Sequence, residues 1–317
     1  MNSILYIVIP CYNEEKVLPI TIPLIVEKVN KLIKAKKISK DSKVLLVDDG
    51  SKDDTWTIIE NSTANKKVEG LKLAGNVGHQ NALLAGLMTA KEKADIVISM
   101  DSDLQDDIDA IDKFIEKYYE GSNIVYGVRS NRKRDSFLKR STAALFYKLM
   151  SWLGAKTINN AADYRLMDRK SLMALEQYNE VNLYLRGIIP SLGYKSDKIY
   201  YERKERVAGK TKYSPRKMIA LAMNGITSFS VKPIRLVALL GSIISISSIF
   251  FFIYILCSKI SGTTVDGWTS LMASIWLIGG MQLLAIGIVG EYIGKIYLET
   301  KARPKYIIER TTIEKKK

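Results

Sequence analysis

Three oxygen-bearing side chains follow a short apolar run in the first half of the chain. The run, Ile96 to Met100, is typical of a buried parallel strand, and Asp101, Asp103 and Gln105 come after it. Residues two apart in an extended chain point to the same side, so these three side chains share one face. Magnesium and manganese ions prefer oxygen ligands and are usually held by one or two carboxylates together with substrate phosphates. The spacing therefore indicates a metal–diphosphate site, the alternative being an acidic loop that caps the next helix.

Two further polar clusters follow apolar runs earlier in the chain. Residues 12–15 come after Ile4 to Ile9, and residues 48–51 come after Lys43 to Val47. The carboxyl ends of parallel strands meet at one edge of a sheet, and ligands bind at that edge. Three such clusters therefore predict a ligand site there. It is not a dinucleotide fingerprint, because no G-x-G-x-x-G follows the first strand, and the chain has no P-loop.

Strand-like and helix-like segments alternate through the first half of the chain, which predicts an α/β domain with a mainly parallel sheet. Besides the three strands above, we expect strands at residues 70–73 and 124–128 and a charged strand or edge at 200–206. The expected helices are residues 17–36, 56–61, 80–91, 108–119, 143–153 and 168–178.

Two long apolar stretches lie in the last third of the chain. Leu236 to Cys257 is 22 residues and Trp268 to Gly290 is 23, and neither contains a charged side chain. At about 1.5 Å per residue, a helix of either length spans the roughly 30 Å hydrocarbon core of a membrane. Residues 198–235 carry ten Lys/Arg against two Glu, whereas the connection 258–267 carries one lysine and one aspartate. The positive-inside rule therefore predicts a two-helix membrane hairpin with both chain termini in the cytoplasm.

These features divide the chain into four parts. Residues 1–214 are the expected cytoplasmic catalytic domain, and residues 236–290 are the transmembrane hairpin. Residues 215–235 have a helical apolar period and predict an amphipathic helix in the membrane interface, the alternative being a helix within the domain. Residues 291–317 are expected to form a basic cytoplasmic tail that is drawn to anionic headgroups.

The chain is strongly basic, with 48 Lys and Arg against 33 Asp and Glu and a net charge of +15. Such an excess fits nucleic acid, an anionic membrane surface or a phosphorylated substrate. RNA binding is disfavoured, because aromatic residues do not interleave with the basic runs. Cys11 and Cys257 are far apart and provide neither a disulfide framework nor a zinc spacing. No signal peptide is expected, since the N-terminus lacks a basic region followed by an apolar core.

Two basic segments are candidates for binding phosphate. Residues 129–140 follow an expected strand, and residues 206–213 contain a glycine flanked by Arg206, Lys210 and Lys212. Such runs are often merely solvated charge. Next to a diphosphate site, however, arginines can pair with phosphate oxygens.

Taken together, these motifs resemble those of the inverting family 2 glycosyltransferases of GT-A fold, which is Rossmann-like. The nearest likeness is to the polyprenyl-phosphate branch, which includes dolichyl-phosphate mannose synthases and bactoprenol glucosyltransferases of the GtrB type. The motifs that carry the resemblance are Pro10-Cys-Tyr-Asn-Glu14-Glu15, Asp48-Asp49-Gly50-Ser51, Asn76-x-Gly78, Asp101-Ser-Asp103-Leu-Gln105 and Arg206-x-x-Gly209-x-x-Lys212-Tyr213. The resemblance covers the whole chain, since the GtrB type also ends in two transmembrane helices. Thr211 and Lys210 stand where the family often has serine and glutamate.

The resemblance implies a role for each motif. Pro10, Tyr12, Glu14, Asp48 and Asp49 would bind the nucleoside. Asp101 and Asp103 would serve the diphosphate and a magnesium or manganese ion, with Gln105 as a further ligand.

The acceptor side is implied in the same way. The residues that would hold the acceptor phosphate are Arg129, Arg140, Arg206, Lys212 and Tyr213, the alternative for Arg129 and Arg140 being the leaving diphosphate. Asp163 and Arg165 would lie near the sugar and the acceptor, and Asp103, Asp163 and Arg129 are the candidate catalytic residues. A general base is not strictly needed, because a phosphate monoester, with a second pKa of about 6, is already largely ionised at neutral pH. His79, the only histidine, is expected to be a helix-entry residue or a neighbour of the sugar pocket rather than a catalyst.

The expected activity is therefore inverting, metal-dependent transfer of a hexose from a nucleotide sugar to a polyprenyl phosphate such as undecaprenyl phosphate. UDP-glucose is the favoured donor, and GDP-mannose, UDP-N-acetylglucosamine and an aminoarabinose donor remain open. A homo-oligomer, for example a tetramer, is implied by the resemblance alone. A processive polysaccharide synthase is disfavoured, because the chain lacks a Gln-x-x-Arg-Trp motif. A non-catalytic membrane protein that senses nucleotides is the other alternative.

Overall fold

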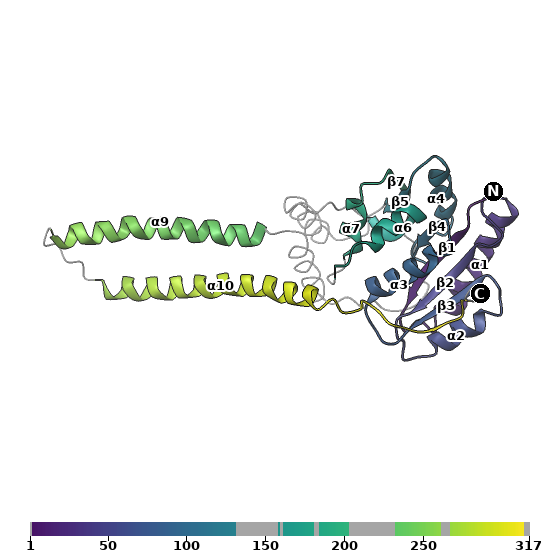
Figure 1. Ribbon diagram of the computed structural model, residues 1–317, viewed down its shortest axis with the longest axis horizontal. Helices are drawn as coiled ribbons and strands as arrows, with labels where there is room; N and C mark the ends of the chain where they lie inside the picture. The colour runs from purple at the N-terminus through teal and green to yellow at the C-terminus, as the bar shows by residue number, and fades with distance from the viewer. Residues whose placement is uncertain are drawn as a thin grey trace.

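The apolar runs of the first half form the parallel strands of a single sheet in the computed structural model, which describes residues 2–130, 158, 161–180, 184–202, 232–260 and 267–313. The sheet has the order β7-β5-β6-β4-β1-β2-β3-β8 (Figure 1). Its strands are β1 (Leu5–Cys11), β2 (Lys43–Asp48), β3 (Val68–Leu73), β4 (Ile96–Ser99), β5 (Ile124–Arg129), β6 (Ala161–Asp168), β7 (Ser196–Tyr201) and β8 (Ile308–Thr311). Strands β1 to β4 are parallel, β7 is parallel to β5, and only β6 and β8 run antiparallel to their neighbours. The predicted α/β class with a mainly parallel sheet is confirmed.

The strand register brings the predicted clusters to one edge. Cys11 at the end of β1 is paired with Asp48 at the end of β2. On the other side of β1, Val8 is paired with Ser99 at the end of β4. The loops that follow these three strands therefore leave the sheet at the same carboxyl edge, as ligand sites in such sheets require.

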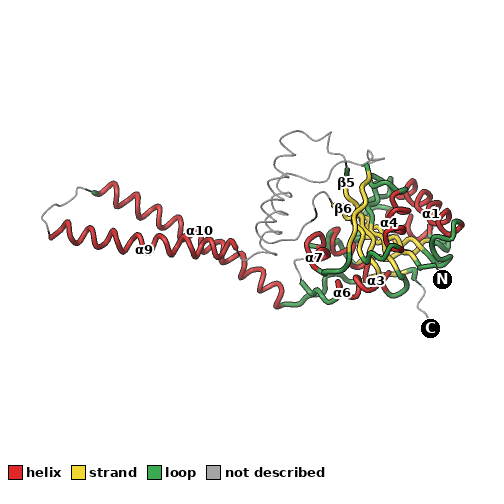
Figure 2. The backbone as a smooth tube through the Cα atoms, turned by 90° about the horizontal axis from the view of Figure 1, so that it is seen from above, coloured by secondary structure: helices red, strands yellow, loops and turns green. Residues whose placement is uncertain are grey.

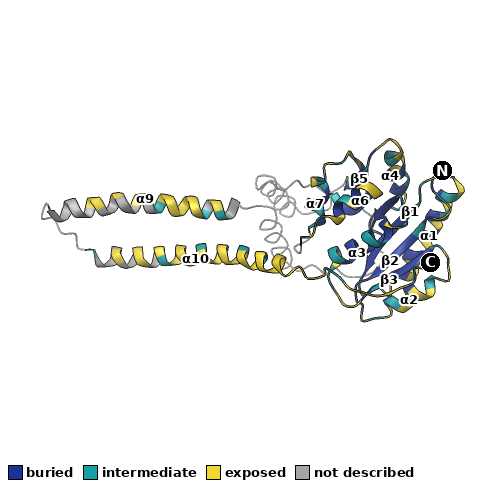
Figure 3. Ribbon diagram, in the orientation of Figure 1, coloured by how far each residue is buried: buried dark blue, intermediate teal, exposed yellow. Residues whose placement is uncertain are grey.

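Helices cover both faces of this sheet. Successive residues of a strand point to opposite faces, and the apolar runs make both faces hydrophobic. On one face Ile7 and Ile9 pack with α1 (Leu18–Lys34), α2 (Thr55–Ser62) and α4 (Ala110–Tyr119). On the other face Tyr6 and Val8 pack with α3 (His79–Lys91), α6 (Arg169–Glu176) and α7 (Leu185–Ser191). Figure 2 shows α1 and α4 on one side of the strands and α6 and α7 on the other, and Figure 3 shows that the strands between them are buried.

Two elements near the site were not predicted. Residues 161–168 form β6, an antiparallel strand between β4 and β5, where the sequence suggested only a lead-in to the following helix. That helix, α6, begins at Arg169 and ends at Glu176, so it is shorter than the expected 168–178. Helix α7 was not expected at all. Strand β7 ends at Tyr201, earlier than the predicted 200–206, of which residues 203–206 lie outside the described residues. The helix predicted at 143–153 also lies outside them, as do residues 215–231 of the helix predicted at 215–235, whose last four residues open α9.

Two long helices follow the α/β domain and run side by side away from it (Figures 1 and 2). They are α9 (Lys232–Ile260) and α10 (Trp268–Thr300). Both extend beyond the predicted spans, because α9 begins at Lys232 and α10 continues to Thr300. Within the described residues, one stretch, Leu277–Thr300, is long and apolar enough to cross a membrane. The span predicted at residues 236–257, and with it the two-helix hairpin, therefore stays a prediction.

The segment predicted to be a basic tail contributes an element of the sheet. Strand β8 pairs antiparallel with β3 and occupies the edge of the sheet. The Thr312 backbone N–H donates to the Gly70 carbonyl at 3.0 Å, and the Thr312 hydroxyl accepts from the Gly70 N–H at 2.8 Å. Because an open strand edge leaves backbone groups unpaired, this strand satisfies groups of β3 that would otherwise face solvent. Part of the predicted tail thus belongs to the α/β domain, whereas residues 314–317 lie outside the described residues.

Candidate active site

The loop after β4 carries the predicted metal carboxylates to the carboxyl edge of the sheet. Asp101 and Asp103 are both half-buried, and one Asp103 carboxylate oxygen accepts the Gln105 backbone N–H at 3.2 Å. Leu104, which lies between Asp103 and Gln105, has a φ of 54°, so the chain turns sharply there. This turn places Asp103 and Gln105 on a compact loop, whereas the sequence predicted that an extended chain would align them.

Asp101 sits in a strongly anionic part of this loop. Burial raises the pKa of Asp101 to about 6, and the charges of Asp106, Asp163 and Asp103 act in the same direction, against the opposing effect of His79. A divalent cation beside Asp101 and Asp103 would relieve this repulsion, and two carboxylates fit an ion that shares its coordination with substrate phosphates. Within the described ranges, no group of three or more histidine, cysteine and acidic side chains is placed to hold a metal.

The residues expected to bind the nucleoside lie in two interlocked loops. Pro10 is buried in β1, and Tyr12 and Glu14 are half-buried in the loop after it. The Glu14 N–H donates to the Thr55 hydroxyl at 2.8 Å. The Lys52 N–H donates to the Asn13 side-chain oxygen at 2.9 Å. The loops after β1 and β2 therefore form one continuous wall of the carboxyl edge.

Asp48 and Asp49 are both buried at the end of β2, and burial raises the pKa of each carboxyl. The Asp49 carboxylate accepts the backbone N–H groups of Val77 at 2.8 Å and Gly78 at 3.1 Å. It also accepts the Asn76 side-chain amide at 3.0 Å. Asp49 therefore braces the turn at which α3 begins. Asp48 instead accepts the Ser51 N–H through one oxygen, and its other oxygen has no partner among the described residues.

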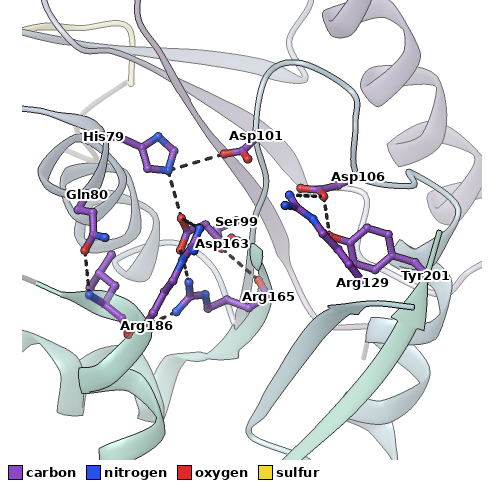
Figure 4. A network of polar contacts seen from close by, with 11 residues as sticks. His79, Gln80, Ser99, Asp101, Asp106, Arg129, Asp163, Arg165, Arg186 and Tyr201 are labelled. Carbon is purple, nitrogen blue, oxygen red and sulfur yellow. Dashed lines mark hydrogen bonds and ion pairs between the residues drawn. The ribbon is translucent and has the colours of Figure 1, made fainter. Parts of the chain in front are cut away.

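Asp163 lies at the centre of a charged cluster that faces Asp101 (Figure 4). Its carboxylate pairs with the Arg165 guanidinium from the same strand. It accepts two N–H groups of Arg186 on α7, from Nη2 at 2.9 Å and from Nε at 3.2 Å. His79 Nε2 lies 3.5 Å from Asp163 and 3.7 Å from Asp101. The cluster therefore joins β6, α7 and the start of α3 to the metal loop.

The electrostatics of this cluster keep Asp163 ionised. Burial opposes the charge, but Arg186, His79 and Arg165 together hold the pKa of Asp163 well below its usual range. Burial likewise opposes protonation of His79, whereas its hydrogen bond to Asp163 and the charge of Asp101 raise its pKa. A carboxylate held this firmly is a weak proton acceptor. The geometry thus favours a role for Asp163 in holding the cationic side chains of Arg165 and Arg186 over a role as general base.

Arg129 at the end of β5 contacts a different part of the same loop (Figure 4). Its Nη2 donates to Asp106 at 3.2 Å, and its Nε donates to the Tyr201 hydroxyl at 3.3 Å. The Tyr201 hydroxyl in turn donates to the same Asp106 oxygen at 2.5 Å. The sequence had assigned Arg129 to phosphate and had given Asp106 and Tyr201 no function.

The structure thus brings Asp101, Asp103, Asp163 and Arg129 around one loop. The acceptor residues Arg140, Arg206, Lys212 and Tyr213 lie outside the described residues. The sequence did not indicate Arg186, because α7 carries no catalytic motif. It also did not predict that His79 lies close to both Asp101 and Asp163. The only sequence signal for His79 was its position after Gly78, where α3 does begin.

Comparison with known proteins supplies the family. Residues 6–175 match the model of the glycosyl transferase family 2 domain. The chain is 57% identical over 309 residues to the uncharacterized glycosyltransferase YkoT of Bacillus subtilis, covering 97% of this chain and 92% of that protein. It is 40% identical over 307 residues to the prophage bactoprenol glucosyl transferase homolog of Escherichia coli, covering 96% and 98%. It is also 40% identical over 306 residues to the bactoprenol glucosyl transferase of Shigella phage SfV, covering 96% and 97%.

Proposed function

The chain belongs to glycosyl transferase family 2, and from that premise we propose that it transfers glucose from UDP-glucose to a polyprenyl phosphate. The observation that carries the proposal is the similarity, over nearly the full length, to proteins described as bactoprenol glucosyl transferases. The GT-A-like domain supports it, because its candidate residues gather at the edge where such sheets bind ligands. The lipid acceptor also accounts for the long exposed apolar helices, on which Leu283 is 72% exposed.

The proposed reaction is a displacement at the anomeric carbon of the sugar. A phosphate oxygen of the acceptor attacks that carbon, the bond to the diphosphate oxygen breaks, and UDP leaves with the electron pair. The acceptor phosphate is already ionised, so no side chain has to remove a proton. This agrees with an Asp163 whose carboxylate already pairs with Arg186 and Arg165 and lies beside His79, rather than being free to accept a proton.

The residues of this site fit a magnesium or manganese ion. Asp101 and Asp103 would hold it, with Gln105 as a further ligand, and the bound ion stabilises the negative charge of the departing diphosphate. Asp48 would accept hydrogen bonds from the nucleoside, and its one buried carboxylate oxygen without a partner among the described residues supports this role. Asp49 supports the same pocket indirectly through the turn at residues 76–78.

We further propose that the α/β domain and both termini are cytoplasmic and that α9 and α10 form a two-span hairpin. The basic residues that precede α9 and follow α10 support this orientation. The return of residues 308–311 to the sheet adds independent support, since it requires the end of α10 and the domain to lie on the same side of the membrane. A homo-oligomer remains a prediction from the family resemblance.

A cysteine introduced at Ser261 tests this orientation in a Cys257→Ser background, where Cys11 is buried. We expect a membrane-impermeant maleimide to label it in intact cells, because the short connection would lie outside. The matched control is Lys113→Cys on the exposed surface of α4, which should be labelled only after lysis. Labelling of both sites only after lysis would contradict the proposed orientation.

A donor screen tests the proposed reaction. The purified full-length protein is incubated with Mn²⁺ or Mg²⁺, undecaprenyl phosphate and one nucleotide sugar at a time, and nucleotide release is measured. We expect lipid-dependent release of UDP from UDP-glucose. Lipid-dependent release of nucleotide from GDP-mannose, UDP-N-acetylglucosamine or an aminoarabinose donor would support the proposed reaction class but would show that the donor is not UDP-glucose. Release that does not depend on the lipid would contradict a polyprenyl phosphate acceptor.

A further inference from the structure

Asp106, Arg129 and Tyr201 form a closed ring of contacts that neither the family motifs nor the proposed chemistry explains. Asp106 is 1% exposed and Tyr201 is 4% exposed, so both are fixed in the core. The Tyr201 hydroxyl donates to Asp106 and accepts from Arg129, and Arg129 also donates to Asp106. Each member therefore contacts the other two. Of the three, Arg129 is the most exposed, with 26% of its side chain accessible.

We propose that Asp106 and Tyr201 are positioning residues that aim the Arg129 guanidinium at the acceptor phosphate. This inference rests on the proposed function, in which Arg129 binds that phosphate. A guanidinium has five N–H donors, and the ring occupies Nε and Nη2. Among the described residues no hydrogen bond from Nη1 is seen, so that group remains for an anion. Because Nε and Nη2 are already held, the Arg129 guanidinium loses less conformational entropy when it binds a phosphate.

The surroundings of Tyr201 show that its hydroxyl is held in place by packing. Its ring meets the Tyr164 ring edge-on with centroids 5.4 Å apart, and Tyr164 meets Phe114 in the same way at 4.7 Å. Gly127 makes room for this stack, because a Cβ there would lie 2.8 Å from the Tyr164 carbonyl and 3.0 Å from the Tyr201 ring. The hydroxyl of Tyr201 therefore has little freedom to turn away from Asp106.

The ring also connects the two halves of the proposed reaction. Asp106 lies in the loop that bears Asp101 and Asp103, and the Tyr164 hydroxyl donates to the Asp107 carbonyl of this loop at 3.0 Å. Arg129 and Tyr201 are the last residues of β5 and β7, which are parallel neighbours paired at these two positions. A change at Tyr201 should thus reach the acceptor phosphate through Arg129 before it reaches the donor.

Tyr201→Phe in the full-length protein tests this inference, because it removes the hydroxyl and keeps the ring. Direct binding of undecaprenyl phosphate and of UDP-glucose with Mn²⁺ is measured alongside the two KM values. Tyr201→Phe removes both hydrogen bonds of the hydroxyl, the one it accepts from Arg129 and the one it donates to Asp106. Because the guanidinium is then less well oriented, we expect the Kd for the lipid to rise about tenfold and the Kd for UDP-glucose to change less than about twofold. The matched control is Tyr200→Phe on the same strand, where the side chain is 61% exposed, and both Kd values should stay as in the wild type.

A second comparison separates positioning from a general structural effect. In an Arg129→Gln background, Tyr201→Phe should weaken lipid binding no further, since the group it positions is gone. Unchanged lipid binding by Tyr201→Phe, or equal weakening of lipid and donor, would overturn the inference. Wild-type protein that binds the lipid but transfers no sugar would overturn the proposed function instead, and the ratio of lipid Kd values would still decide the role of Tyr201.

Discussion

Asp103→Ala is expected to lower turnover by about a hundred- to a thousandfold while the protein still folds and inserts into membranes. Asp103 is half-buried on the loop after β4, where its carboxylate accepts the Gln105 backbone N–H at 3.2 Å. Losing a group that stabilises the charge developing on the leaving diphosphate costs rate in this range. The measurement is kcat for lipid-dependent UDP release over a titration of Mn²⁺. We expect higher Mn²⁺ to recover part of the lost rate, because the variant binds the ion more weakly.

Asp109→Asn is the matched control for this substitution. It removes a carboxylate only six positions along the chain, but its side chain is 80% exposed and pairs with Lys28 at 2.7 Å, away from the metal loop's carboxylates. Lys28 keeps a second partner in Asp112 at 2.6 Å, so kcat and the Mn²⁺ dependence should remain those of the wild type. Wild-type turnover by Asp103→Ala would remove the metal site from this loop. An equal loss in both variants would mean that the net charge of the loop, and not Asp103, is what matters.

Asp163→Asn is expected to destabilise the α/β domain as well as to lower activity. The change leaves Arg165, which is 2% exposed, without its buried counter-ion, and it also removes the partner of Arg186 and His79. Removing one partner of a buried pair costs about 3–5 kcal/mol. For a domain of this size that lowers Tm by roughly 6–20 °C. The measurement is a thermal melt of the detergent-purified protein, followed by activity at a temperature below the lowered Tm.

The control for Asp163 is Asp197→Asn on β7, whose carboxylate pairs with Lys117 at 3.2 Å and is 41% exposed. Its Tm should stay within about 2 °C of the wild type, as expected for a surface pair. The result also decides between two roles for Asp163. An Asp163→Asn variant with wild-type Tm and abolished turnover would favour Asp163 as a general base and would contradict an anchoring role.

The features of the site that follow from local pattern were predictable. An apolar run that ends in polar residues marks both a buried strand and its carboxyl end, so Asp48, Asp101 and Asp103 could be placed at one edge before any coordinates. Strand β6 could not be found in this way. Asp163 and Arg165 interrupt its apolar character, and their burial depends on partners elsewhere, above all Arg186 from α7.

Contacts between residues distant in sequence could not be predicted from the hydrophobic pattern. Asp106 is 23 residues from Arg129 and 95 from Tyr201, and no periodicity connects them. The same holds for Thr312 and Gly70, which are 242 residues apart and bring β8 to the sheet. Basic residues dominate the sequence around β8, so its composition indicated a tail, whereas the unpaired edge of β3 is what determines its place.

The most direct test of the central claim is the structure of the product. The full-length protein is given UDP-[¹³C]glucose, Mn²⁺ and undecaprenyl phosphate, and the lipid fraction is analysed by mass spectrometry and by NMR of the anomeric carbon. We predict one hexose joined to the lipid phosphate with its anomeric configuration inverted relative to UDP-glucose. Label found only as free glucose, or a lipid product with retained configuration, would contradict inverting transfer to a polyprenyl phosphate.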